Sequence, residues 1–585
     1  MSKNVIFGIN GPVVTVADSK DFKMQEMVYV GKKRLIGEVI SIDDKLTTIQ
    51  VYEVTTGLKP GEPVEPTGSP MSVLLGPGML SNIFDGIQRP LKNIEDISGA
   101  FIETGINLSS LDEKKLWNTE ILVKAGDNVS PGQIIAQCSE TQSIMHKIMI
   151  PPNVCGTVVY AANSGPYRIH DRICEVETSD GNKIIITLCQ KWPIRIPRPV
   201  KLRKPCSKPL ITGQRVIDTL LPIAKGGTAA IPGGFGTGKT MTQHQLAKWC
   251  DADIIIYVGC GERGNEMTQV LNEFCELTDP RSGRKLTDRI VLIANTSNMP
   301  VAAREASVYT GISIAEYYRD MGYSVAMMAD STSRWAEALR EISGRLEEMP
   351  AEEGFPAYLP SRLAAFYERA GSFETLSNSE GSITIIGAVS PQGSDFSEPV
   401  TQNTKRFTNV FWALDKSLAY ARHYPAINWI DSYSEYDTTL ANYYNNSVDP
   451  SFMHCRQTVM QILSQESQLI EIVKLIGANV LPDDQKLVID IAKVIRVGFL
   501  QQNAYHSDDT FVPLNKQFLM MKTIVHLYEA AKKLIAVNKP IRSLEETGIY
   551  EKLIRMKYDI PNSNPELLNG YIDEIDTIIN KLISA

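Results

Sequence analysis

The chain has 585 residues, more than one hydrophobic core accommodates, so several domains are expected. Its formal net charge of -8 argues against a general nucleic-acid binder, which normally carries a basic surface. No stretch approaches the roughly 18 to 20 apolar residues that span a bilayer, so any membrane role would depend on partners. The nine cysteines form no CxxC pair and are expected to be buried reduced thiols of a cytoplasmic protein.

The first third of the chain reads as β-structure. Short apolar runs separated by Gly/Pro turns predict a small β-barrel over residues 1–70 and, after a connector at 71–115, a β-rich insertion at 116–188. The insertion contains no catalytic spacing, which favours a structural or docking module. A cofactor-carrier role is disfavoured because no exposed lysine stands at the position that such domains modify.

The pattern changes between residues 189 and 440. Short apolar runs at 228–231, 253–259, 289–297, 323–330 and 382–390 alternate with helical segments, which predicts a parallel sheet covered by helices. Residues 441–585 show helical periodicity, for example from Val459 to Ile476. The expected fold is therefore a multidomain α/β protein with an N-terminal barrel, a β-rich insertion, a central P-loop (RecA-type) domain and a C-terminal helical domain.

A glycine-rich stretch, "GGFGTGKT", fits the pattern G-x-x-x-x-G-K-[ST] between a short strand and a helix. Its glycines allow backbone N–H groups to converge on phosphate oxygens, and the helix N-terminus adds partial positive charge. Lys239 is expected to reach the β- and γ-phosphates, and the Thr240 hydroxyl to bind Mg²⁺. The predicted nucleotide-binding residues here are Gly233, Gly234, Phe235, Gly236, Thr237, Gly238, Lys239 and Thr240.

Two acidic residues stand at the end of one further predicted strand and shortly after the end of another. Asp330 closes the run "YSVAMMAD" and is the candidate to hold Mg²⁺ through water. Glu262, in "VGCGERGNEM", is the candidate general base, and Arg263 could stabilise phosphate charge or orient Glu262. Glu266 is a weaker candidate, since a carboxylate in the first turn of a helix is commonly structural.

Together, "GGFGTGKT", "GCGERGNEM", "ADSTSRWAEAL", "GAVSPQGSDFSEPVTQNT" and "HYPAINW" resemble the catalytic A subunit of V-type (archaeal-like) rotary ATPases. The resemblance covers essentially the whole chain. The block at 116–188 matches the insertion that separates A subunits from F-type β subunits. Three positions depart from the family pattern: Gly234 replaces a usual proline, Thr237 stands where eukaryotic relatives carry a cysteine, and Tyr424 replaces a usual phenylalanine.

The resemblance implies an alternating hexamer of A and B subunits with Mg²⁺ and ATP or ADP at A/B boundaries. The B subunit would supply an arginine finger, so this chain alone should hydrolyse ATP poorly. An adenine pocket would use Tyr424, Gln502 and Tyr505. Central-stalk and peripheral-stalk subunits would hold the complex on the cytoplasmic face of a membrane. ATP hydrolysis or synthesis would be coupled to movement of H⁺ or Na⁺, the ion being selected by membrane subunits.

Two other functions compete with this one. A protein-export ATPase or a ring helicase shares the P-loop core but lacks the 116–188 block. A non-catalytic nucleotide-binding subunit usually loses part of the phosphate loop or the glutamate, whereas Lys239, Thr240, Glu262 and Asp330 are all present here.

Overall fold

The structure is a computed structural model that describes residues 4–17, 21–99, 102–279, 282–477 and 480–584. The chain forms two compact units. The first unit contains residues 1–205, 226–228 and 252–408, and the second contains residues 206–225, 229–251 and 409–585.

The first unit begins with a six-stranded antiparallel sheet in the order β1-β2-β5-β4-β3-β6. Its strands are β1 (Ile6–Asn10), β2 (Val13–Ala17), β3 (Glu26–Val30), β4 (Leu35–Ile42), β5 (Leu46–Val51) and β6 (Val64–Pro70). Backbone hydrogen bonds from Ile6 to Glu62 and from Val64 to Asn4 join the two edges of this sheet. Alternate side chains, mostly valine, isoleucine and leucine, fill the interior. These residues therefore form the predicted barrel.

The insertion consists of two four-stranded antiparallel sheets, β10-β13-β15-β16 and β12-β11-β9-β14. Its strands are β9 (Trp117–Ile121), β10 (Asn128–Val129), β11 (Ile134–Ser139), β12 (Met145–Met149), β13 (Gly156–Ala161), β14 (Gly165–Tyr167), β15 (Cys174–Glu177) and β16 (Lys183–Ile186). It is flanked by β7 (Ser72–Leu75) and β17 (Gln190–Pro193), which pair with each other. The chain thus leaves and re-enters the main body of this unit through adjacent strands.

The main sheet of the first unit is parallel in the order β24-β22-β20-β21-β8. Its strands are β8 (Ile83–Phe84), β20 (Ile254–Glu262), β21 (Ile290–Thr296), β22 (Ser324–Asp330) and β24 (Glu380–Val389). Nearly every residue of these strands is buried, because helices cover the sheet. Two short antiparallel strands, β18 (Leu202–Lys204) and β23 (Gly371–Glu374), extend the sheet beyond β24.

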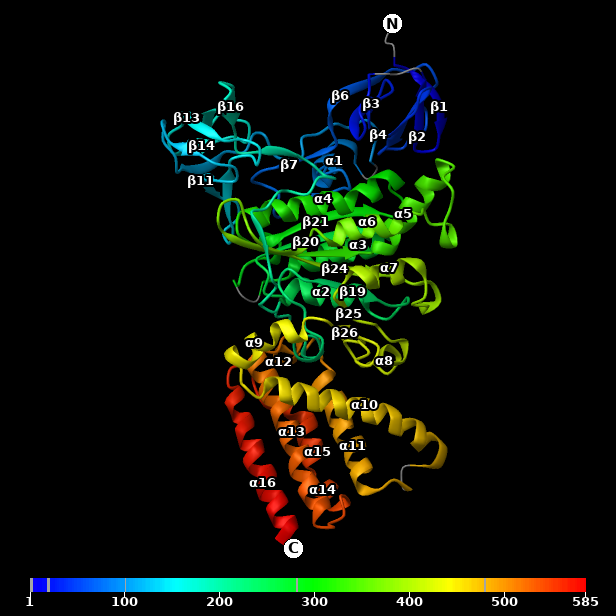
Figure 1. The fold of residues 1–585 in the computed structure, drawn as a ribbon, viewed down its shortest axis with the longest axis vertical. Helices are drawn as coiled ribbons and strands as arrows, with labels where there is room; N and C mark the ends of the chain where they lie inside the picture. Colours follow the sequence, from blue (N-terminus) through cyan, green and yellow to red (C-terminus); the bar gives the residue numbers. More distant parts are fainter. Residues whose placement is uncertain (1–3, 18–20, 100–101, 280–281, 478–479, 585) are drawn as a thin grey trace. The chain divides into compact units, whose positions relative to one another are not determined.

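Helices of the first unit connect the parallel strands (Figure 1). The central one, α4 (Val301–Asp320), packs on β20, β21, β22 and β24, and is buried over most of its length. The others are α1 (Leu91–Ser98), α3 (Gly264–Glu276), η2 (Leu286–Arg289), α5 (Thr332–Arg345), η3 (Glu352–Gly354), α6 (Leu359–Tyr367), η4 (Gln392–Ser394) and α7 (Pro399–Phe407).

The second unit combines a small strand–helix element with a helical bundle. Strand β19 (Thr228–Pro232) pairs in parallel with β25 (Val410–Phe411), which pairs with β26 (Tyr433–Ser434). A π-helical turn, η1 (Val216–Leu220), precedes β19 in the chain, and helix α2 (Lys239–Trp249) follows β19.

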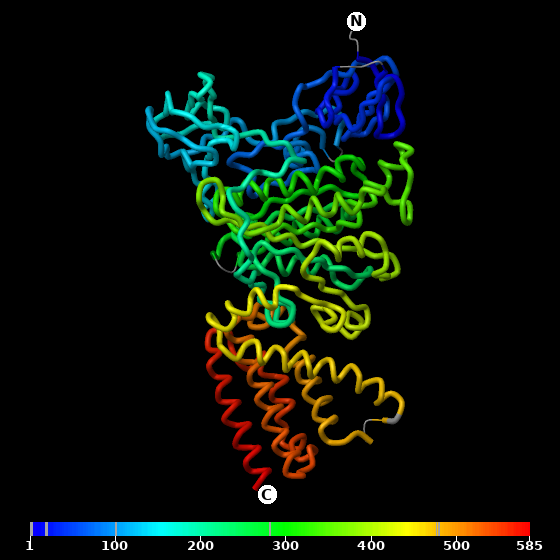
Figure 2. The backbone as a smooth tube through the Cα atoms, viewed as in Figure 1, coloured from blue at the N-terminus to red at the C-terminus, as the bar shows by residue number. Residues whose placement is uncertain are grey.

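Most helices of the second unit pack together in a C-terminal bundle, seen as the yellow to red segments of Figure 2, whereas the short helix α8 (Lys416–Tyr420) lies outside it, near β26 (Figure 1). The other helices after β25 are α9 (Asp437–Ser447), α10 (Phe452–Ile476), α11 (Asp483–Val494), η6 (Ile495–Leu500), α12 (Ser507–Thr510), α13 (Leu514–Ala536), α14 (Arg542–Glu545), α15 (Ile549–Asp559), η7 (Pro565–Leu568) and α16 (Asn569–Ser584). Helix α13 packs against α10, α11, α15 and α16, and therefore forms the centre of the bundle.

The multidomain α/β fold predicted from the sequence is confirmed, with two corrections of detail. Only five of the nine cysteines are buried, and Cys155 and Cys275 are exposed. The apolar stripe of α10 is buried at Val459 and Leu469 but exposed at Ile472, because the core ends before the last turn of the helix. The predicted domain 189–440 contributes residues to both units, and its boundaries stay predictions. No helix among the described residues has both the length and the apolarity needed to cross a membrane.

Candidate active site

The loop between β19 and α2 is shaped by its glycines. Gly236 and Gly238 have φ angles of 79° and 88°, a backbone conformation that favours glycine. Gly233 permits close packing, since a Cβ atom at this position would lie 2.6 Å from the Thr237 hydroxyl oxygen. That hydroxyl donates to the carbonyl of Gly234 at 2.8 Å. The residues therefore form a tight turn at a helix N-terminus, the geometry in which backbone N–H groups bind phosphate.

Lys239 begins helix α2, and its ammonium group lies over the loop. Its Nζ atom donates to the carbonyls of Gly233 and Gly234 at 2.6 and 3.2 Å. A phosphate would offer this ammonium charged acceptors, which form stronger hydrogen bonds than carbonyls do. Thr240 is half-buried in the first turn of the same helix, and Phe235 is exposed.

A cavity of about 650 Å³ in the second unit includes two of the loop glycines. Its volume suits a nucleotide-sized ligand. The cavity brings together all three residues proposed for the adenine pocket, Tyr424, Gln502 and Tyr505. Sequence reasoning missed Tyr558, which no local motif marks. The lining consists of Gln214, Gly236, Gly238, Met241, Thr242, Gln245, Arg422, Tyr424, Pro425, Gln501, Gln502, Asn503, Ala504, Tyr505, Thr510 and Tyr558.

The three predicted adenine-pocket residues differ in what they offer a ligand. Tyr505 is 95% exposed, and Tyr424 lies beside the phosphate loop, 3.7 Å from the position of a Cβ atom on Gly238. Both rings are available for stacking on a base. The Gln502 amide instead bonds the protein: its oxygen accepts from the Arg215 backbone N–H at 2.5 Å, and its nitrogen donates to the carbonyls of Gly213 and Asp509. Gln502 therefore shapes the cavity through its position in the chain.

In the first unit, Glu262 and Asp330 end neighbouring parallel strands. Glu262 is the last residue of β20, and Asp330, the last residue of β22, is paired in register with Gly259. Asp330 is buried and accepts a hydrogen bond from the Tyr257 hydroxyl at 3.2 Å. The two carboxylates thus lie together at the carboxyl edge of the sheet, where α/β proteins bind their ligands.

The pKa of Glu262 is raised to about 8. Burial is the largest cause, followed by the negative charge of Asp330 and by a hydrogen bond and a like charge from Glu266. Arg334 opposes this shift and lowers the pKa of Glu262. At neutral pH a carboxyl group with this pKa is mostly protonated, but its ionised fraction is a stronger base than an ordinary carboxylate and grows as the pH rises, a property that suits a general base.

The charged neighbours of Glu262 come from α3 and α5. Arg263 is exposed immediately before α3, and Glu266 stands in its first turn. Arg334 lies in α5, where its guanidinium pairs with Glu337 at 2.7 Å. Sequence reasoning missed Arg334, although it follows Asp330 closely in "ADSTSRW". Glu266, a weaker candidate by its position in a helix, is a direct electrostatic neighbour of Glu262.

Each of the two units has an oxygen donor of a kind that Mg²⁺ binds. Mg²⁺ prefers oxygen ligands and usually takes only one or two from the protein, the others being phosphate oxygens and water. The Thr240 hydroxyl and the Asp330 carboxylate are donors of this kind. No group of three or more His, Cys, Asp or Glu side chains within the described residues is arranged to hold a metal without such help.

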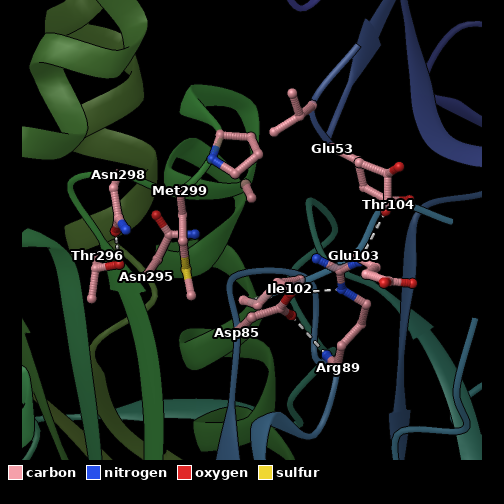
Figure 3. A pocket seen from close by; sticks show the side chains of 13 residues that line it. Glu53, Asp85, Arg89, Ile102, Glu103, Thr104, Asn295, Thr296, Asn298 and Met299 are labelled. Carbon is pink, nitrogen blue, oxygen red and sulfur yellow. Dashed lines mark hydrogen bonds and ion pairs between the residues drawn. The ribbon is translucent and has the colours of Figure 1, made fainter. Parts of the chain in front are cut away.

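A second cavity, of about 380 Å³, lies in the first unit between the barrel, the connector and the residues after β21 (Figure 3). Arg89 lines this cavity, and its guanidinium forms ion pairs with Asp85 at 2.7 Å and with Glu53 at 3.1 Å. These carboxylates raise the pKa of Arg89 although burial opposes its charge. Because this cationic group is already neutralised, the cavity is poorly suited to a polyphosphate, which requires free positive charge.

Four family profiles match successive parts of the chain. They describe the ATP synthase alpha/beta family β-barrel domain at residues 6–68, the barrel-sandwich domain of ATP synthase alpha/beta subunits at 108–195, the nucleotide-binding domain of the same family at 213–434, and the C-terminal domain of V- and A-type ATP synthases at 441–544. The last match is specific to one branch of the family.

Relatives match the chain over its full length. The V-type ATP synthase alpha chain 2 of Clostridium tetani is 58% identical over 99% of this chain and 98% of its own length. This chain belongs to the family of V- and A-type ATP synthase catalytic (A or alpha) chains. A further family member is the corresponding chain of the A-type ATP synthase of Methanopyrus kandleri, 54% identical over 99% of this chain and 98% of its own. The resemblance drawn from the sequence motifs is thereby confirmed.

A solved structure outside this branch shares the fold of the family. It is that of the assembled ATPase EscN from the type III secretion system of enteropathogenic E. coli, with 21% identity and a TM-score of 0.63. The match covers 89% of this chain and all of the EscN chain. At this level of sequence identity, the comparison shows a shared fold and says nothing about function. A protein-export ATPase therefore remains the weaker alternative for the function of this chain.

Proposed function

We propose that this chain is the catalytic A subunit of a V-type rotary ATPase, which hydrolyses or synthesises ATP in coupling with H⁺ or Na⁺ translocation. The chain would itself carry out the chemistry at the nucleotide, while other subunits would move the ion. It would lie on the cytoplasmic face of the membrane through the assembled complex. Family membership and the chemistry of the two regions described above support this proposal.

Each site residue has a proposed role in phosphoryl transfer to water. Lys239 binds the β- and γ-phosphates, and Thr240 supplies a hydroxyl ligand to Mg²⁺, with Asp330 acting through a bound water. The bound Mg²⁺ would neutralise charge on the phosphates. Glu262 accepts the proton of the attacking water, and Arg263 orients Glu262 or stabilises phosphate charge. Tyr424 and Tyr505 provide aromatic faces for the adenine.

The partners are proposed from the family. B subunits would alternate with this chain in a hexamer and place an arginine next to the γ-phosphate, a contribution worth roughly 10³- to 10⁵-fold in related NTPases. Central-stalk subunits would rotate within the hexamer, and peripheral-stalk subunits would contact the insertion at 116–188. No role for nucleic acid is proposed.

The observation that carries the catalytic proposal is the position of Glu262 at the end of β20, next to the end of β22 where Asp330 lies, and the raised pKa of Glu262 agrees with it. A protein that only holds nucleotide needs the phosphate loop and the base cavity but has no use for a half-buried carboxyl group of raised pKa beside the carboxyl edge of the sheet. Here the chain has both.

The dependence on a partner can be tested directly. ATPase activity is measured for the purified chain alone and for the purified complex, with Na⁺ titrated in both. We expect turnover to rise by roughly 10³-fold or more in the complex, because the arginine finger comes from another chain. Full activity of the isolated chain would contradict the proposed shared site. Stimulation by single-stranded nucleic acid would favour the helicase alternative, and activation by Na⁺ would identify the ion.

The charges around Glu262 predict two opposite shifts in pH dependence. The profile of kcat/KM reports ionisations of the free enzyme, and it should rise with pH as Glu262 loses its proton. Glu266→Gln removes a negative charge that raises the pKa of Glu262, so the rise should move to lower pH by about 0.5 to 1 unit. Arg334→Gln removes a charge that lowers this pKa, so the rise should move upward.

The control for this pair is Glu276→Gln, which changes an exposed carboxylate at the far end of α3. It should leave the profile in place. Shifts in the same direction for Glu266→Gln and Arg334→Gln would mean that Glu262 does not govern the profile.

A further inference from the structure

The segment that forms one wall of the base cavity begins at the end of a helix. Helix α11 continues into the π-helical turn η6, and residues 501–505, here named the base loop, follow directly. The last carbonyls of a helix have no partner within it and must be satisfied from elsewhere. Whatever bonds these carbonyls also sets the direction in which the base loop leaves the helix.

Two cationic side chains from distant parts of the chain fulfil this need. Lys557 of α15 donates from Nζ to the carbonyl of Val497 at 2.7 Å and to that of Gln501 at 3.0 Å. The Arg215 guanidinium donates to the carbonyl of Gln501 at 2.9 Å and also to that of Phe499. Cations at a helix C-terminus complement its negative end. The helix end and the first residue of the base loop are therefore fixed by positive charges.

Both cations are withdrawn from water. Lys557 is 3% exposed and Arg215 is fully buried. Burial and the nearby charge of Arg215 lower the pKa of Lys557 to about 8, which still leaves it mainly protonated at neutral pH. Asp509 balances part of this charge through its 2.6 Å ion pair with Arg215, and its other carboxylate oxygen accepts from the backbone N–H of Asn503 at 2.7 Å. Charged hydrogen bonds in such surroundings are strong.

The outer part of the base loop has weaker support. Tyr505 is 95% exposed, and its backbone N–H bonds the side chain of Asn503 within the loop. The position of the Tyr505 ring at the cavity therefore depends on the position of residues 501–503, which precede it in the base loop. Tyr558, the residue after Lys557, lines the same cavity from α15.

We propose that Lys557 is a positioning residue for base recognition: it ties the base loop to α15 and so places Tyr505 and Tyr558 around one base site. The proposal rests on the proposed function, since it assumes that the cavity receives the adenine of ATP. The phosphate loop belongs to β19 and α2, whereas the carbonyls that Lys557 bonds belong to η6 and the base loop. Loss of Lys557 should therefore weaken recognition of the base and spare recognition of the phosphates.

The chain offers a matched control in Lys516. This lysine is also fully buried in the second unit, and burial likewise lowers its pKa to about 8. Its Nζ atom donates to the carbonyl of Ile560 at 2.7 Å and to the Asn562 side chain at 3.0 Å, and at longer distance to the carbonyls of Asp508 and Lys557 at 3.3 and 3.4 Å, all of them outside the base loop. Lys516→Met should thus reproduce the cost of losing a buried lysine without releasing the base loop.

The test compares two ligands on the full-length chain by calorimetry: Mg·ATP, and Mg·tripolyphosphate, which has phosphates and no base. For Lys557→Met we expect the Kd of ATP to rise about tenfold, as for the loss of charged hydrogen bonds, and the Kd of tripolyphosphate to change less than about twofold. Lys516→Met should change neither Kd by more than about twofold. For Lys557→Arg, the Kd of ATP should stay within about threefold of the wild-type value.

Two results would overturn the proposal. One is equal weakening of ATP and tripolyphosphate by Lys557→Met, and the other is the same ATP affinity in Lys557→Met and Lys516→Met. If Lys557→Met fails to fold by circular dichroism, Lys557→Gln compared with Lys557→Arg carries the same test. A wild-type chain that binds neither ligand would instead overturn the proposed function, so the two failures are distinguishable.

Discussion

Glu262→Gln in the assembled complex is expected to hold ATP and lose turnover. The substitution keeps the size of the side chain and its place at the end of β20 but removes the group that accepts a proton. General-base catalysis contributes typically 10²- to 10⁴-fold, so kcat should fall by about that factor, while the Kd of ATP should stay within about threefold. Steady-state ATPase rates and equilibrium binding of ATP give the two quantities.

The control for this variant is Glu276→Gln, a charge-removing change on the helix that follows Glu262. It should keep both turnover and binding. Near-normal turnover in Glu262→Gln would exclude Glu262 as the base. A loss of binding as large as the loss of turnover would show that Glu262 supports the fold of the site rather than the chemistry.

The sequence predicts best those features that depend on neighbouring residues. The glycine spacing of the phosphate loop is local, because the positive φ angles of Gly236 and Gly238 and the close packing of Gly233 arise within one turn. The apolar runs of the parallel strands are also recognisable, since buried strands show uninterrupted hydrophobicity. Strand β20 nevertheless extends beyond its predicted end at residue 259 to Glu262, because backbone pairing with β21 continues after the apolar residues stop.

Features that depend on distant segments are not predictable from spacing. The Gln501 carbonyl meets Arg215, which is 286 positions away, and Lys557, which is 56 positions away. No periodicity or motif links such residues, and a buried lysine in an amphipathic helix resembles any solvent-facing lysine in sequence. The same holds for Gln502, which family resemblance predicts to contact ATP but whose amide is bonded to the protein.

Substitution of Lys239 should weaken ATP binding, which substitution of Glu262 should leave intact. Lys239→Met keeps the length of the side chain and removes the ammonium that lies over the carbonyls of Gly233 and Gly234. Charged hydrogen bonds contribute about 1.5 to 3 kcal/mol each, so the Kd of ATP should rise by roughly 10- to 150-fold. Turnover at saturating ATP should also fall, by about 10³-fold, since the same charge stabilises the transferring phosphoryl group.

Lys248→Met provides the matched control, because Lys248 lies in the last turn of the same helix and is also partly buried. Lys248→Met should change the Kd of ATP by less than about twofold, as expected for a lysine distant from the phosphates. If Lys239→Met binds ATP normally, the loop does not hold the phosphates as proposed. If Lys239→Met loses ATP binding while Glu262→Gln retains it, the phosphate loop binds the nucleotide and the carboxyl group at the end of β20 takes part in its cleavage. Hydrolysis then requires both.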